Sequence, residues 1–221
     1  MIRRYPDVFQ LALTAQDVEE SIAAGKIASL FGAEGGHSIE NSLEKLQTLY
    51  DRGVRYMTLT HNVSLDWADS CTGEVLHNGL TDFGVQVVHE MNRMGMIVDI
   101  SHVSPDTMRD ALVNTKAPVM FSHSSALALS SHVRNVPDDV LRSVTENNGI
   151  VMVNFYSGFV VSPEELAINP DEPGDFRLVV DHIDHIATIA GVDHVGLGGD
   201  YDGVNGMPTG LEDVSTYPVI T

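Results

Sequence analysis

Short apolar runs alternate with amphipathic segments along most of the chain, and this alternation restricts the fold more than any other feature. Six apolar runs are predicted to be buried strands: 27–33, 54–60, 97–100, 118–121, 149–155 and 194–199. The intervening segments carry apolar residues at the spacing of about 3.6 residues that predicts helices, and they cover 39–52, 82–95, 105–116, 137–148 and 176–190. Continuous apolar strands separated by helices indicate an α/β fold with a parallel sheet covered by helices. A doubly wound sheet and a (β/α) barrel both fit this pattern.

Composition limits the class of protein and the kinds of partner. The chain has 221 residues, 43% apolar and 19% charged, which is typical of a globular protein, and we expect a single domain over residues 1–221. Its 31 acidic and 12 basic residues give a net charge of −19. This charge argues against nucleic acid and against an anionic membrane surface as partners, because binding to either needs a cluster of basic residues on the protein surface.

One cysteine, Cys71, and ten histidines decide which metal sites are possible. A single cysteine allows no internal disulfide and no zinc site of the Cys-x-x-Cys type. Any transition metal would therefore be held by histidines and carboxylates.

Ionisable side chains follow five of the six apolar runs. They are Glu34, His61, His102, His123 and Asp200. In a parallel barrel the C-terminal ends of the strands share one face, so these side chains would converge there. A single histidine at the end of a strand is more often a hydrogen-bonded polar residue than a metal ligand. Burying all five side chains together, however, would cost several kcal/mol without a compensating ion. Imidazole and carboxylate are ligands of Zn²⁺, so the set indicates a metal site.

Seven sequence blocks carry a resemblance to a known family. They are GAEGGHSIENS (32–42), YMTLTHNVSLDWAD (56–69), VDISHVSPDTM (98–108), APVMFSHSSA (117–126), RNVPDDVL (134–141), IVMVNFY (150–156) and GLGGDYDGV (196–204). In this order they resemble the renal, or membrane, dipeptidase family of zinc peptidases. The resemblance implies zinc-dependent hydrolysis of dipeptides on a TIM-like (β/α) barrel, here incomplete with about six of the eight strands.

The resemblance also implies which residues bind the metal ions. Glu34 matches the glutamate that bridges two zinc ions, and His102 and His123 match the two histidines of the second zinc. A hydroxide held between two metal ions would be the nucleophile, since bound cations lower the pKa of water.

Three further residues match the family's catalytic and substrate-binding positions. His61 matches the histidine that contacts the substrate and helps to polarise the scissile carbonyl, and Asp200 matches the acid/base aspartate. Arg134 matches the arginine that binds the substrate's terminal carboxylate. Without the resemblance, we would interpret Arg134 as a surface residue paired with Asp138 or Asp139.

The His-x-Asp pair expected for the first zinc is not found on a strand near the N-terminus. The six predicted strands resemble the family's third to eighth, so we expect a chain truncated at both ends, with three of five zinc ligands and weak or no dipeptide hydrolysis. His182 and Asp184 have the right spacing. They lie in a predicted helix, however, where side chains two positions apart point about 200° away from each other.

Two other functions remain open: hydrolysis of N-acyl amino acids or lactams on the same barrel, and a binding or structural role for a catalytically inactive relative. The resemblance implies a dipeptide or similar small substrate and allows a homodimer. We expect no membrane contact by this segment itself. The location stays open, because eukaryotic members are typically secreted or membrane-anchored and bacterial members are often cytoplasmic.

Overall fold

Six parallel strands form one curved sheet in the computed structural model, which describes residues 1–169 and 174–220. The strands are β3 (Phe31–Ala33), β4 (Val54–Thr58), β5 (Ile97–Asp99), β6 (Met120–Phe121), β7 (Ile150–Val153) and β8 (Val195–Leu197). They are ordered β3 to β8 without a reversal, whereas a doubly wound sheet reverses direction at a switch point. Strands β3 and β8 do not pair with each other, so the sheet is not closed. The prediction of an incomplete barrel is confirmed.

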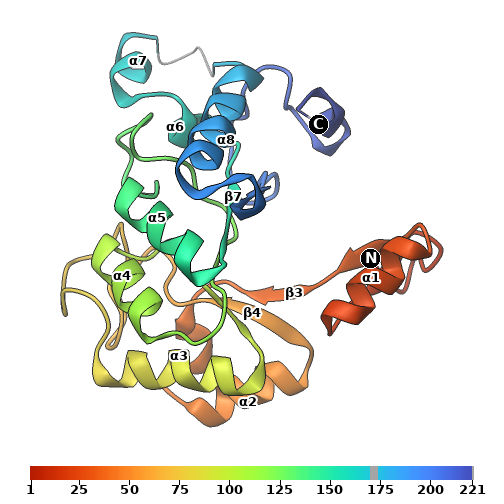
Figure 1. Cartoon of the computed structure of the whole chain (residues 1–221), viewed down its shortest axis with the longest axis vertical. Coiled ribbons are helices and arrows are strands. Elements are labelled where there is room, and N and C mark those ends of the chain that lie inside the picture. The colour runs from red at the N-terminus through yellow and green to blue at the C-terminus, as the bar shows by residue number, and fades with distance from the viewer. Residues whose placement is uncertain (170–173, 221) are drawn as a thin grey trace.

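Helices cover the outer face of this sheet, as Figure 1 shows. They are α2 (Leu43–Asp51), α3 (Asp82–Met94), α4 (Pro105–Asn114), α5 (Asp138–Asn147) and α8 (Phe176–Ala190). Side-chain caps fix where several of them begin: Ser42, Thr81 and Ser104 each accept a hydrogen bond from a backbone N–H of the first turn. The helices were predicted correctly, except that α2 begins after a short 3₁₀ turn, Gly36–Ile39.

The hydrophobic core lies between the sheet and the helices. Met57, Val98 and Phe121 point outward from neighbouring strands and are 0–1% exposed. They belong to the same core cluster as Val87 of α3 and Leu141 of α5. Complete burial of such side chains contributes about 1.5–3 kcal/mol each. The strand positions between them face the inside of the sheet and are free to carry polar groups.

The N-terminal part differs from the prediction. The run 27–33 is not one strand, because it is divided into β2 (Ile27–Ser29) and β3. Strand β2 pairs in parallel with β1 (Phe9–Leu11), with α1 (Ala15–Ala23) between them. This unit extends away from the six-stranded sheet (Figure 1). Apolar residues lie on both sides of Leu30, and neither proline nor a charged residue marks the point where the chain changes partner.

The segment after β7 forms two short helices, α6 (Ser157–Val160) and α7 (Pro163–Ile168). The Pro-rich, acidic sequence of residues 162–175 predicts a surface excursion, of which residues 170–173 lie outside the described residues. The 3₁₀ helix Val192–His194 directly precedes β8, and a second one, Val214–Val219, lies near the C-terminal end of the described residues. No helix in the described ranges is long and apolar enough to cross a membrane.

Candidate metal centre and substrate cavity

Three of the predicted metal ligands meet at the C-terminal end of the sheet. Glu34 directly follows β3, and His102 and His123 lie just after β5 and β6. Glu34 Oε1 lies 3.1 Å from His102 Nε2 and 3.3 Å from His123 Nε2. The two Nε2 atoms are 2.9 Å apart. The structure therefore brings all three donor groups to one point.

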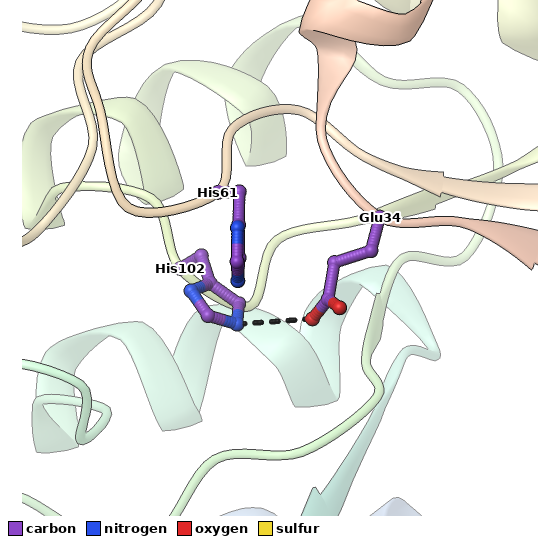
Figure 2. A group of neighbouring side chains, drawn as sticks. All are labelled: Glu34, His61 and His102. Carbon is purple, nitrogen blue, oxygen red and sulfur yellow. Dashed lines mark ion pairs between the residues drawn. The ribbon is translucent and has the colours of Figure 1, made fainter. Parts of the chain in front are cut away.

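His61 joins this cluster from the loop after β4. Its imidazole lies beside that of His102, with ring centroids 4.5 Å apart, and Figure 2 shows the Glu34 carboxylate facing the same two rings. Donor atoms of Glu34, His61 and His102 all lie within 4.8 Å of one another. His61 is thus close enough to contact either a metal ion or a substrate held on one.

The donor set fits a divalent cation such as Zn²⁺. Tetrahedral zinc with bonds of about 2.1 Å keeps its donor atoms about 3.4 Å apart, and the separations here are 2.9–3.3 Å. Hydrogen bonds from His102 and His123 hold the pKa of Glu34 well below its usual range. Burial lowers the pKa of His102 to about 4. At neutral pH the carboxylate is ionised and His102 is neutral, the forms that coordinate a cation.

Asp200 follows β8, the edge strand opposite β3, and lines the same cavities as Glu34 and His123. Asn154, which follows β7, donates a hydrogen bond from Nδ2 to Asp200 Oδ2 at 3.1 Å. Asp200 and His102 both have left-handed backbones, with φ of 60° and 69°. Such conformations are unfavourable for residues other than glycine and concentrate at functional sites.

One cavity of about 220 Å³ connects all of the predicted site residues. Its lining includes Glu34, His61, His102, His123, Arg134 and Asp200. The remaining wall is formed partly by His132 and Phe159, whose rings stack with centroids 4.6 Å apart. A second cavity of about 420 Å³ between β3 and β8 shares Glu34, His123 and Asp200 with the first.

Arg134 is a buried cation in this cavity, with only 2% of its surface exposed. Its Nη2 donates to the His123 carbonyl oxygen at 3.2 Å and its Nη1 to Ser124 Oγ at 3.4 Å. Its Nε has no hydrogen-bond partner, and no carboxylate in the described part of the chain forms an ion pair with it.

The interpretation of Arg134 as a surface residue is wrong. Asp138 pairs instead with His185, and Asp139 pairs with Arg109. Arg134 lies over the Phe159 ring, 5.2 Å from its centroid. The buried guanidinium therefore keeps hydrogen-bonding capacity that the protein itself does not use.

His182 and Asp184 do not replace the His-x-Asp pair. His182 is 1% exposed on α8, where its Nδ1 accepts a hydrogen bond from Ala126 N at 2.9 Å. Its Nε2 lies 3.2 Å from the Val160 carbonyl oxygen. Both ring nitrogens thus join α8 to neighbouring segments. Asp184 is exposed, so the two side chains diverge as the helical spacing predicted.

Sequence reasoning missed two residues that support the site, Asp99 and Asn154. Asp99 is fully buried at the end of β5 and accepts hydrogen bonds from the backbone beside both histidines, His102 and His123. An acidic residue inside the apolar run 97–100 is the signal that could have identified it. Asn154 follows β7, just as the other site residues follow their strands. Its side chain is uncharged, however, and the prediction from the sequence rested on ionisable residues.

A family model described as membrane dipeptidase (peptidase family M19) matches residues 1–221. The chain belongs to the membrane dipeptidase family. Solved structures agree. A metallopeptidase from Rhodobacter sphaeroides, bound to a phosphinate mimic of the dipeptide L-Ala-D-Ala, is 27% identical with a TM-score of 0.88, over 99% of this chain and 62% of that one.

Two more dipeptidases have the same fold. One, described as a metallopeptidase of family M19, is 27% identical with a TM-score of 0.88, over 99% of this chain and 63% of that one. The probable dipeptidase PvdM from Pseudomonas aeruginosa is 22% identical with a TM-score of 0.88, over 100% of this chain and 68% of that one. The chain thus spans about two thirds of these proteins. Membership in the membrane dipeptidase family assigns it to the peptidases.

Proposed function

We propose that this chain binds Zn²⁺ and a dipeptide in the cavity at the C-terminal end of its sheet, as part of a zinc-dependent dipeptidase. The observation that carries the proposal is Arg134, a buried cation without a carboxylate partner in the same cavity as the Glu34 cluster. Leaving such a charge unpaired is costly, and a substrate carboxylate would compensate it. The cavity of about 220 Å³ shares three residues with the neighbouring cavity of about 420 Å³, and the two together offer room for a small ligand.

Glu34, His102 and His123 would hold the metal. When bound, Zn²⁺ supplies a polarised carbonyl and a water of lowered pKa. His61 donates a hydrogen bond to the scissile carbonyl oxygen, where negative charge develops in the transition state. Asp200 accepts the proton of the attacking water and returns it to the leaving amine, and Asn154 orients its carboxylate for both steps.

Arg134 selects the substrate. Its planar guanidinium can bind a terminal carboxylate through two parallel hydrogen bonds. A peptide bond in the middle of a long chain has no terminal carboxylate close to it that could reach Arg134. The arrangement therefore favours short peptides with a free C-terminus. N-acyl amino acids offer the same carboxylate and stay the alternative substrates.

We propose one tightly bound zinc per chain, and weak hydrolysis by these residues alone. The donor groups described above form a single cluster, and no second group of this kind occurs among residues 1–169 and 174–220. The His-x-Asp pair that the family resemblance implies for a first zinc is not matched by His182 and Asp184, which lie on α8.

The test combines metal analysis with ligand binding. We expect one zinc per chain, and a zinc-dependent affinity for a dipeptide that falls at least tenfold, about 1.4 kcal/mol, when its C-terminus is amidated. Equal binding of the amide, or no zinc binding, would overturn the proposal. Turnover of a dipeptide and of its N-acetyl amino acid counterpart separates the two substrate classes, and binding without turnover of either would indicate an inactive relative.

A further inference from the structure

One buried carboxylate connects the two turns that carry His102 and His123. Asp99 is 0% exposed at the end of β5. Its Oδ1 accepts hydrogen bonds from Ser101 N at 3.0 Å and from Ser122 N at 3.1 Å. Ser101 directly precedes His102, and Ser122 directly precedes His123. A single oxygen atom therefore fixes the backbone immediately before both histidines.

Ser101 provides a second link between the same turns. Its Oγ accepts a hydrogen bond from His123 N at 3.1 Å and another from Ser124 Oγ at 3.3 Å. With Asp99, it makes the ends of β5 and β6 one hydrogen-bonded unit. The unit holds the backbones of the two imidazoles whose Nε2 atoms lie 2.9 Å apart.

The sheet itself does little to fix this separation. Strand β6 has only two residues, and the β5–β6 ladder contains one register pair, Asp99 with Met120. His102 has φ of 69°, a conformation that costs about 1–2 kcal/mol for a residue with a Cβ. The His102 carbonyl oxygen accepts hydrogen bonds from Cys71 N at 2.9 Å and from two hydroxyl groups of the loop after β4. These bonds hold the turn to that loop and do not set its distance from His123.

We propose that Asp99 is a positioning residue that sets the spacing of His102 and His123 for the metal, an inference that rests on the zinc site of the proposed function. Its other oxygen, Oδ2, has no hydrogen-bond partner among the described residues. The carboxylate thus makes its hydrogen bonds only to the two histidine turns. Replacing it should affect the metal site before it affects any distant part of the fold.

Asparagine and alanine at this position separate positioning from simple loss of a buried residue. Asp99→Asn keeps a carbonyl oxygen where Oδ1 accepts its two hydrogen bonds, so we expect a zinc affinity within threefold of the wild type. Asp99→Ala removes both hydrogen bonds, and we expect it to weaken zinc binding by about 10–100-fold, the usual effect of losing a residue that orients metal ligands. The visible absorption of bound Co²⁺ should be unchanged in the first variant and altered in the second.

Asp110→Ala is the matched control. Asp110, on α4, also accepts a backbone hydrogen bond, from Leu80 N at 2.8 Å, but it makes no hydrogen bond to either histidine turn. We expect its zinc affinity to match the wild type. If Asp99→Ala does not fold, Ser101→Ala carries the test, since it removes only the Oγ links and should still weaken zinc binding about tenfold.

The outcomes distinguish this inference from the proposed function. Wild-type zinc affinity in Asp99→Ala or, where that variant does not fold, in Ser101→Ala would overturn the positioning role and leave the zinc site standing. Equal losses in Asp99→Asn and Asp99→Ala would also overturn it, because the charge rather than the hydrogen bonds would then matter. If the wild-type chain bound no zinc, the proposed function would fail, and this inference with it.

Discussion

In the role proposed for it, Arg134 serves substrate binding at the expense of the stability of the fold. Burial lowers the pKa of its guanidinium, which measures how unfavourable the charged form is in that position. The protein offsets part of this cost with two long hydrogen bonds from the guanidinium and with a cation–π contact to the ring of Phe159. A residue kept for structure would have a carboxylate partner, as Arg109 has in Asp139.

Replacing Arg134 by methionine should therefore separate the two properties. We expect Arg134→Met to leave the free energy of unfolding unchanged or to raise it by about 1 kcal/mol, because a costly buried charge is removed. Dipeptide binding should weaken by about 2–5 kcal/mol, the usual cost of losing one partner of a buried charge pair. Urea denaturation and calorimetry measure both quantities. Lower stability with unchanged dipeptide affinity would show that Arg134 is structural.

His61 can be tested against His123, which lies in the same cluster. If His61 contacts the substrate, His61→Ala should keep zinc affinity within about threefold and lose dipeptide affinity by at least tenfold, about 1.4 kcal/mol. His123→Ala should lose zinc, since it removes a proposed ligand. Equal losses of zinc affinity in the two variants would make His61 a metal ligand, which its place within 4.8 Å of Glu34 and His102 also permits.

The positions of the site residues could be predicted because they follow from topology. Parallel strands in sequence order bring their C-terminal ends together, so residues directly after the strands meet, as Glu34 and His123 do. The role of Asp99 could not be predicted in this way. It depends on the register of β5 against β6, which places Oδ1 between two backbone N–H groups, and apolar periodicity does not determine register.

Among the elements, helices were predicted better than strands, and α8 illustrates the reason. Its residues 176–190 combine an apolar face with an Asp175 cap that accepts a hydrogen bond from Arg177 N, so pattern and cap agree on where it begins. The run 27–33 has no such signal. Its residues are mostly apolar on both sides of Leu30, and the division comes from pairing with β1 on one side and with β4 on the other.

The histidine at the centre of α8 should make stability depend on pH. Burial lowers the pKa of His182 and outweighs the opposing effect of the hydrogen bond to the Val160 carbonyl oxygen; neighbouring charged groups contribute less. The unfolded chain has a histidine pKa of about 6.5, so below that pH it binds a proton that the folded state resists. The free energy of unfolding should fall as the pH falls through 6.5, by at most about 1.4 kcal/mol per pH unit from this residue.

His182→Asn measures this contribution, because asparagine does not titrate and can still accept the hydrogen bond from Ala126 N. Its unfolding free energy should change less than that of the wild type between pH 7.5 and pH 5.5 in urea denaturation. His89→Asn, at an exposed position of α3, is the control and should keep the wild-type slope. Parallel slopes for the wild type and His182→Asn would contradict the assignment.

For the whole molecule, the proposed metal site would also connect strands. Glu34, His102 and His123 come from the ends of three different strands of a sheet that is not closed. The chain also carries a net charge of −19, whose self-repulsion disfavours the compact state. A cation held at this point would join β3, β5 and β6 and neutralise part of that charge.

Zinc should therefore raise the melting temperature by linkage. At a free concentration 100 times its dissociation constant, a ligand that binds only the folded state adds about 2.7 kcal/mol, which corresponds to about 5–11 °C for a chain of this size. Differential scanning calorimetry with zinc and then with a chelator measures the shift and its reversal. Glu34→Gln should lose most of the shift while its metal-free melting temperature changes little, because the Glu34 side chain is 52% exposed. An equal shift from Mg²⁺ would mean that charge neutralisation alone stabilises the molecule, since a site of imidazoles and one carboxylate should prefer zinc.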